Sequence, residues 1–302
     1  MSQWFRSMVV ALACTLLAGC SMTEAAPESS PTPLTAVAAF GDFTTIDYCS
    51  LLDLPKVAGG IRAGAPDSSF ESCQAELTDE SGKRQVMVGP LAFDSDPNIR
   101  PYDYSGPLPD GVSVQQSMFN DQNACTRAVT FGDGIRLNVS VTGPGRTDVR
   151  CREADAAVTG VITAVGGGKV GRLNFAARSW GRVSPCALLD VHELDAPSGA
   201  GTKPTTGLSG HSCFRGKVSL ALSVAPMDGT GPLETLGGRQ ARVAIKGAFC
   251  TVDTTQPAPG MRGRTERAEI SVVETAGTAG DATCASARSA AAAILPRLPA
   301  SS

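Results

Sequence analysis

Short segments of this chain alternate hydrophobic and polar residues, or run hydrophobic, between turns rich in Gly, Asp and Pro. Such segments predict β-strands. In the first half they span residues 85–93, 113–119, 124–131 and 135–142, and in the second half residues 217–226, 241–253 and 266–274. Asp133-Gly134, between the last two segments of the first half, is a typical two-residue signal for a hairpin.

Apolar residues with helical spacing occur near the start of each half. In the first half, Leu51, Leu52 and Leu54 form an apolar stripe directly after Cys49. Such a stripe predicts a short helix that follows the cysteine. In the second half the same stripe is formed by Leu188, Leu189, Val191 and Leu194.

Each half also closes on an alanine-rich segment, residues 151–165 in the first and 284–298 in the second. These segments predict closing helices, with Asp148 and Asp281 as their N-cap residues. Together with the strands they predict an α+β fold of two tandem similar domains. Each domain is expected to be an antiparallel sheet with helices packed on one face and two disulfides.

Cysteine-containing motifs recur in the same order in the two halves. The motif C-x-L-L-D occurs at residues 49–53 and again at residues 186–190, and the second cysteine of each half follows a serine. The third cysteine of each half precedes a threonine, and the fourth begins the alanine-rich segment. Four matching landmarks in one order predict a tandem repeat.

The repeat sets the expected domain boundaries. We expect a first four-cysteine domain over residues 38–165 and a second over residues 176–302. Residues 166–175 contain four glycines and predict the linker. This glycine-rich segment is not a phosphate-binding loop, because Val170 rather than Ser or Thr follows Lys169.

The N-terminus predicts export. Arg6 precedes an apolar run from Met8 to Ala18, which is too short to span a bilayer and is typical of a secretory signal. Leu17-Ala18-Gly19-Cys20 resembles the bacterial lipobox, which implies cleavage before Cys20 and attachment of acyl chains to its sulfur. We therefore expect a signal peptide over residues 1–19. The alternative is an ordinary secreted protein whose signal contains two cysteines.

Residues 20–37 predict a flexible stalk, because they are rich in Pro and Ser and lack aromatic residues. The expected location is the extracytoplasmic face of the cell membrane, held by the lipid anchor.

Export favours disulfides over zinc for the remaining cysteines. No C-x-x-C pair occurs, whereas structural zinc sites draw their ligands in close pairs. Four cysteines allow three pairings in each half. The spacing of the first and second cysteines, and of the third and fourth, changes less between the halves than the middle spacing, which favours pairing in those couples. The expected pairs are Cys49 with Cys73, Cys125 with Cys151, Cys186 with Cys213, and Cys250 with Cys284.

In this order of motifs the chain resembles actinobacterial envelope lipoproteins that carry a domain of unknown function. The resemblance covers residues 40–165 and 173–299 and includes the final C-x-x-A helices, the second of which runs into Leu295-Pro296. A more distant likeness is to the extracellular sensor domain of mycobacterial receptor kinases. The resemblance implies an envelope location, a two-disulfide α+β domain and a binding role. The chain departs from the family in carrying two such domains.

Composition excludes one class of function. The chain is 42% hydrophobic and 18% charged, with a net charge of −3, so it is a globular chain without the basic surplus of a nucleic-acid-binding protein. The charge is unevenly divided, since residues 38–165 are acidic and residues 166–302 are basic. The halves could dock through complementary fields, the basic half could rest near anionic lipid or polymer, or the surfaces could have drifted after duplication.

Catalytic chemistry is not indicated by the histidines. His192 lies in V-H-E-L-D, which lacks the second histidine of a zinc protease motif, and we expect it at a partly solvated helix position near Asp195. His211 follows Gly210 at a turn, and we expect it in a surface loop. No G-x-S-x-G elbow occurs.

The acidic pairs Asp94 with Asp96 and Asp79 with Glu80 lie in turn-like sequence, where solvated loops are a simpler interpretation than a glycosidase pair or a calcium loop. No catalytic, cofactor-binding or metal-binding residue is therefore expected, and no cofactor.

The sequence predicts a non-catalytic binding or accessory module for an envelope ligand or protein partner, anchored to the membrane. Two alternatives remain: an envelope hydrolase that uses cleft carboxylates, and a structural scaffold of an envelope complex.

Overall fold

A computed structural model describes residues 32–120, 123–199, 201–225, 231–275 and 277–300. Residues Thr32–Ser302 form one compact unit. The predicted signal peptide, Cys20 and most of the predicted stalk lie outside the described residues. Below, "first half" means residues 32–165 and "second half" means residues 176–300.

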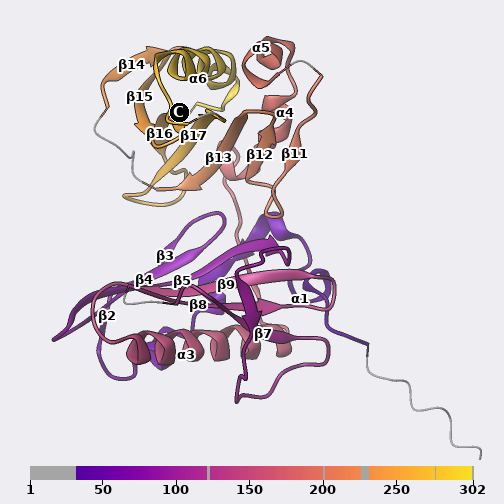
Figure 1. The fold of residues 1–302 in the computed structure, drawn as a ribbon, viewed down its shortest axis with the longest axis vertical. Coiled ribbons are helices and arrows are strands. Elements are labelled where there is room, and N and C mark those ends of the chain that lie inside the picture. Colours follow the sequence, from indigo (N-terminus) through magenta and orange to yellow (C-terminus); the bar gives the residue numbers. More distant parts are fainter. Residues whose placement is uncertain (1–31, 121–122, 200, 226–230, 276, 301–302) are drawn as a thin grey trace, which may run out of the picture. The chain divides into compact units, whose positions relative to one another are not determined.

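The first half contains an antiparallel sheet (Figure 1). Its main strands alternate buried and exposed side chains, as in Cys73–Asp79, so one face packs on a core. The strands in sheet order are β2 (Arg62–Ala63), β4 (Cys73–Asp79), β5 (Gly82–Phe93), β9 (Ile135–Thr142), β8 (Ala124–Thr130), β7 (Ser113–Ser117) and β6 (Ile99–Pro101), and β3 (Asp67–Ser68) pairs with β4. The four strands predicted here are confirmed, and Asp133-Gly134 lies in the turn between β8 and β9.

The second half contains a seven-stranded sheet in which strands that follow one another along the chain take the same places across the sheet as in the first half. Its strands in sheet order are β11 (Thr205–Thr206), β12 (Ser212–Arg215), β13 (Val218–Val224), β17 (Thr265–Val273), β16 (Phe249–Pro257), β15 (Arg239–Lys246) and β14 (Leu233–Leu236). The single strand predicted over residues 241–253 is wrong. The chain reverses at Gly247, whose φ of 62° suits a tight turn, and the segment forms parts of β15 and β16.

A third, two-stranded sheet joins the predicted linker to the first half. Its strands β1 (Ile46–Asp47) and β10 (Gly171–Arg172) pair antiparallel, and Leu173 N donates to Thr45 O at 2.7 Å. The linker segment is therefore fixed against residues 45–47. The fold is mixed α+β, as predicted.

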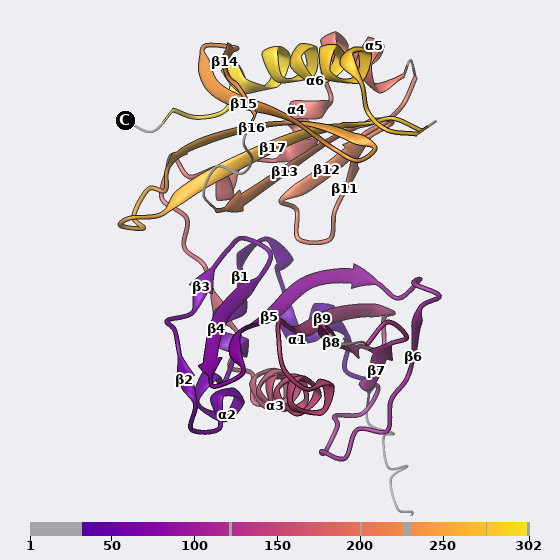
Figure 2. The same cartoon turned by 60° about the vertical axis from the view of Figure 1, so that its left-hand side comes forward.

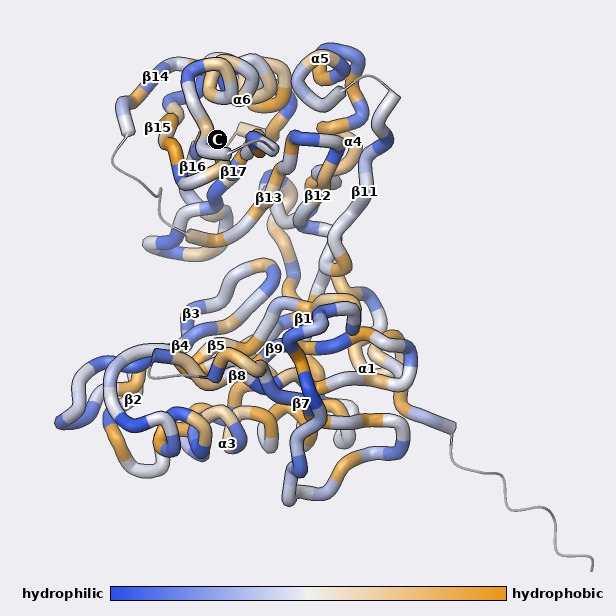
Figure 3. Tube along the Cα trace, viewed as in Figure 1, coloured by the Kyte–Doolittle hydropathy of each residue, from blue (hydrophilic) through white to orange (hydrophobic). Residues whose placement is uncertain are grey.

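A long helix lies along one face of each sheet (Figure 2): α3 (Thr147–Gly166) in the first half and α6 (Asp281–Ile294) in the second. Hydrophobic residues recur along both helices (Figure 3). The predicted caps are wrong by one or two residues. The N-cap positions are Arg146 and Gly280, and Asp148 and Asp281 lie in the first turn, where a carboxylate still favours the helix dipole.

The short helices near the first cysteine of each half are interrupted. The remaining helical elements are α1 (Ala36–Phe40), η1 (Phe43–Thr45), η2 (Tyr48–Leu51), α2 (Leu54–Ala58), η3 (Trp180–Arg182), α4 (Pro185–Leu189), η4 (His192–Leu194), α5 (Asp195–Ser198) and η5 (Leu295–Arg297). Because Ala36 is buried in α1, residues 36 and 37 belong to a helix and not to the predicted stalk.

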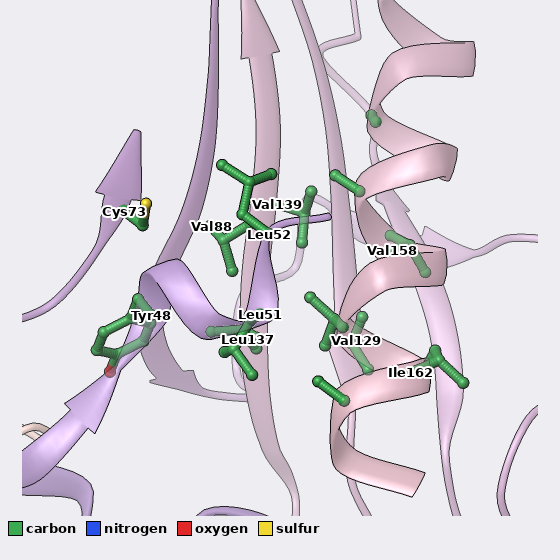
Figure 4. Close-up of a cluster of buried hydrophobic side chains, with 14 of the residues drawn as sticks. Tyr48, Leu51, Leu52, Cys73, Val88, Val129, Leu137, Val139, Val158 and Ile162 are labelled. Atoms are coloured by element: carbon green, nitrogen blue, oxygen red, sulfur yellow. The ribbon is translucent and has the colours of Figure 1, made fainter. Parts of the chain in front are cut away.

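The first hydrophobic core lies between the sheet and α3. Figure 4 shows Val158 and Ile162 of α3 beside Val129 and Leu137 of the sheet, with Leu51 nearby. A buried ion pair links α3 to the sheet: the Arg84 guanidinium on β5 lies 2.7 Å from the Glu153 carboxylate on α3 and also bonds Asp79. The second core lies between the other sheet and α6, and α6 contributes mostly small side chains to it, among them Ala287, Ala290 and Ala291.

Four disulfides connect the helical elements to the sheets, in the expected pairs. They are Cys49–Cys73, Cys125–Cys151, Cys186–Cys213 and Cys250–Cys284. In each half one disulfide links a short helical element to the strand that carries the second cysteine: η2 to β4 in the first half and α4 to β12 in the second. The other disulfide links the long helix to the sheet, α3 to β8 and α6 to β16. Among the helices described within residues 32–300, none combines the length and apolar character that a bilayer crossing requires.

Candidate functional site

One aromatic residue of the first half lies in the core of the second. Phe70, between β3 and β4, is 0% exposed and belongs to the hydrophobic cluster built around Trp180 and Leu220. Its ring meets the ring of Phe175 edge to face, with centroids 5.3 Å apart. The hairpin of β3 and β4 therefore connects the two halves through a buried side chain.

The corresponding hairpin of the second half reaches the first half. It is formed by β11 and β12 and carries Leu208, which packs against the first hydrophobic core. In both hairpins the loop lies just before the second cysteine of the half, so Glu71 and His211 occupy equivalent positions in Glu71-Ser72-Cys73 and His211-Ser212-Cys213. The two halves thus exchange matching contacts at one junction.

His211 is buried at this junction, so its predicted surface-loop location is wrong. Its residue is 1% exposed, and its ring packs against Phe70 and Phe175 at centroid distances of 5.0 and 5.7 Å. Nε2 donates to the Thr44 carbonyl at 2.9 Å, because a carbonyl can only accept. Nδ1 has no hydrogen-bond partner among the described residues.

Burial has an electrostatic consequence for His211. Desolvation disfavours the imidazolium and lowers the pKa of His211 below its usual value of 6.5. The hydrogen bond to Thr44 and the carboxylates of Glu71 and Asp42 oppose this effect more weakly. The neutral imidazole is therefore the form that fits the junction.

Polar contacts across the junction pair the acidic first half with the second. The Glu71 carboxylate accepts hydrogen bonds from the hydroxyls of Ser209 and Ser212, the latter at 3.3 Å. The Asp67 carboxylate forms an ion pair with Arg264. Complementary charge thus contributes at this contact, in line with one of the interpretations of the uneven charge distribution.

A cavity of about 510 Å³ lies at the junction. This is within the range of small-molecule sites in proteins, roughly 300–1,000 Å³. Its lining residues come from both halves and from the segment between them: Thr44, Thr45, Leu173, Asn174, Phe175, Gly181, Arg182, Val183, Ser184, Thr206, Gly210 and His211.

A buried carboxylate fixes the segment that forms one wall of the cavity. Glu266 accepts hydrogen bonds from Trp180 N at 2.8 Å and from the Ser179 hydroxyl, and Gln256 Nε2 donates to it at 2.8 Å. These contacts hold η3, which carries Gly181 and Arg182. The wall is therefore built on a buried, hydrogen-bonded backbone.

Two glycines permit close approach at the cavity. Gly210 has a φ of 75°, and a Cβ on it would lie 2.7 Å from Thr44 Cγ2. A Cβ on Gly181 would lie 2.5 Å from the Phe175 ring. Any larger residue would displace a lining side chain of the cavity.

The arrangement offers binding groups but no catalytic group of a known pattern. The Ser209 and Ser212 hydroxyls bond Glu71 while the His211 Nε2 bonds a carbonyl, so neither of these two serines is activated by the histidine. His192, whose side chain is 95% exposed, lies 3.5 Å from Asp195 at the expected i to i+3 spacing. Among the described residues no group of His, Cys, Asp and Glu is placed to hold a metal ion.

Of the residues that line the cavity, only His211 is singled out by the sequence analysis, and its predicted location in a surface loop is wrong. Asp94 and Asp96 face Arg136, and Asp79 bonds Arg84, so neither acidic pair lies at the cavity. One available signal was the alignment of Glu71 with His211 before matching Ser-Cys pairs. Because these two residues are polar and hold equivalent positions in the two hairpins, they are candidates for contacts between the halves.

The stability conferred by His211 is expected to depend on pH. The pKa of His211 is lower in the folded protein than the value of 6.5 for the unfolded chain. As pH falls below 6.5, the histidine is therefore protonated in the unfolded chain before it is protonated in the folded protein. Stability decreases over this range until the pH reaches the folded-state pKa. In chemical denaturation from pH 7.5 to 5, the stability advantage of the wild type over His211→Gln should therefore shrink. A constant difference over that range would contradict the burial of a neutral imidazole.

Comparison with known proteins leaves the family open. No protein-family model matches the chain, and no curated protein matches it. One solved structure, that of DynU16 from the dynemicin biosynthetic locus, is 15% identical and aligns over 89% of this chain and 94% of that chain, with a TM-score of 0.17. A similarity at this level carries no argument about fold or function.

Proposed function

We propose that this chain is a cell-envelope lipoprotein, anchored to the extracytoplasmic face of the membrane through Cys20. The protein binds an envelope ligand without catalysing a reaction. The observation that carries the binding role is the cavity at the junction, whose lining comes from both halves. A ligand held there would contact Thr44 of one half and Thr206 of the other.

The anchor rests on the sequence Leu17-Ala18-Gly19-Cys20 and on the apolar run before it. Acyl chains on Cys20 would add about 0.8 kcal/mol of membrane affinity for each buried methylene. Residues 21–31 are polar and rich in proline, which suits a tether between the membrane and the compact unit.

We attribute the two halves to duplication of one domain. Support comes from the common strand order of the two sheets, the long helix on one face of each, and the equivalent disulfides. A site at the junction of two copies needs both, so it is a property of the duplicated protein.

Neither alternative function has a supporting observation. The buried carboxylates are already engaged, since Asp253 pairs with Arg267 at 2.8 Å and Glu266 holds the η3 segment. A hydrolase that uses cleft carboxylates would need at least one of them at the cavity, and no Asp or Glu is among the lining residues that the structure describes. A scaffold would not require a cavity.

Lipid attachment can be tested directly. In a bacterial host with lipoprotein processing, mass spectrometry should find Cys20 as the acylated first residue of the membrane-bound protein. Cys20→Ala should move the protein from the membrane to the soluble fraction, whereas Cys14→Ala should not, since Cys14 lies within the expected signal peptide. A Cys20→Ala protein that stays in the membrane would show that another feature anchors it.

Ligand binding can be tested with two tryptophan variants in the same strand. Thr206 and Thr205 are both exposed on β11, but only Thr206 lines the cavity, since neighbouring strand residues point to opposite faces. Small molecules that co-purify with the protein are released by solvent extraction and quantified. Thr205→Trp should yield as much of them as the wild type, and Thr206→Trp at least about tenfold less. The binding function is wrong if the wild type releases nothing beyond a mock purification, or if Thr206→Trp retains as much.

A further inference from the structure

The cavity has an unbalanced set of polar groups. Among the described residues, its lining includes Arg182 and His211 and no acidic side chain. Two carboxylates lie nearby but are occupied: Glu71 accepts two serine hydroxyls, and Asp42 accepts bonds from the Thr44 backbone and hydroxyl at 3.0 and 2.8 Å. Hydrogen bonds from Thr44 are the main cause that lowers the pKa of Asp42.

Arg182 differs from the five arginines of the second half that form an ion pair with a carboxylate. Arg215, Arg264 and Arg267 each pair with a carboxylate. Arg182 is exposed, and its guanidinium forms no hydrogen bond or ion pair with any other described residue. Its backbone is nonetheless fixed, because η3 is held by Glu266.

The rest of the lining supplies neutral donors and apolar surface. The Asn174 side chain has no hydrogen-bond partner among the described residues, and the Ser184 oxygen accepts only from Ala187 N, which leaves its O–H free to donate. Leu173, Phe175 and Val183 provide apolar area in the same cavity.

We propose that the cavity binds a small organic anion with an apolar body, and that Arg182 receives its anionic group. This inference rests on the proposed binding function and names the ligand class. A guanidinium presents several N–H donors in a planar fork that matches carboxylate, phosphate and sulfonate oxygens. Arg182 has no partner among the described residues, and the described lining offers neutral donors and no competing carboxylate, so the cavity should select anions over neutral analogues.

The test uses two probes that share one apolar skeleton. Anilinonaphthalene sulfonate carries an anionic group, and N-phenylnaphthylamine is the same skeleton without it. Binding of both to the purified full-length protein is followed by fluorescence. The variants are Arg182→Gln, the matched control Arg178→Gln on an exposed arginine of the same segment that does not line the cavity, and Thr206→Trp to block the cavity.

The wild type should bind the sulfonate at least about tenfold more tightly than the neutral probe. Arg182→Gln should lower the affinity for the sulfonate about fivefold or more and leave the affinity for the neutral probe unchanged. Arg178→Gln should bind both probes as the wild type does. Displacement of the bound sulfonate by dodecanoate and by dodecyl phosphate then tells whether a carboxylate or a phosphate is preferred.

Four results would overturn the inference. Equal affinity for the two probes, or sulfonate binding unaffected by Arg182→Gln, would remove the selection for anions and leave a cavity that binds apolar molecules. Unchanged sulfonate binding by Thr206→Trp would place the probe elsewhere. If neither probe binds the wild type, both the anion preference and the proposed binding function fail.

Discussion

Phe70 is the contact on which the junction depends. It belongs by sequence to the first half, yet its side chain is completely buried in the core of the second. Truncation of a buried phenylalanine costs about 3–5 kcal/mol, a large part of the stability of an ordinary domain. Its ring also packs against Phe175 and His211, two lining residues of the cavity. The cavity wall and the second core are therefore stabilised by the same side chain.

The disulfide on α6 complements the small side chains with which that helix packs on its sheet. Under α6 the contacts are made largely by alanines, which bury little apolar area. A cross-link between the sheet and the helix lowers the entropy of the unfolded chain and compensates for this, by about 3 kcal/mol for a closed loop of a few tens of residues. Each long helix carries one such link, Cys151 to β8 and Cys284 to β16. The glycine-rich composition is compatible with a stable fold for this reason.

Local patterns were sufficient to predict the fold class. Alternation identified the central strands, and matched spacing identified the cysteine pairs, because both depend on residues close in sequence. The turn at Gly247 is not predicted because the β-formers Ile245 and Phe249 lie only two residues to either side of it, so the segment reads as one strand. The N-caps were misplaced because Arg146 and Gly280 lack the side chains that usually mark a helix start.

The site was beyond what local patterns could predict. Its residues lie on segments up to 167 positions apart, as in the hydrogen bond of Thr44 with His211. A loop composition of Gly, Ser and His favours solvent exposure, and only the packing of Phe70 and Phe175 around His211 reverses this. The one signal for a contact between the hairpin loops, the equivalent positions of Glu71 and His211, comes from comparing the two halves and not from the local sequence of either.

The most direct test of this account is an unfolding measurement on Phe70→Ala followed by Trp180 fluorescence. Trp180 is buried in the second core, and Trp4→Phe would leave it as the sole tryptophan. If Phe70 is part of that core, the Trp180 transition should lose about 3–5 kcal/mol of stability, whereas the matched variant Phe214→Ala, which truncates a ring that is 55% exposed, should change it little. A Trp180 transition that moves no more in Phe70→Ala than in Phe214→Ala would contradict a junction built on Phe70.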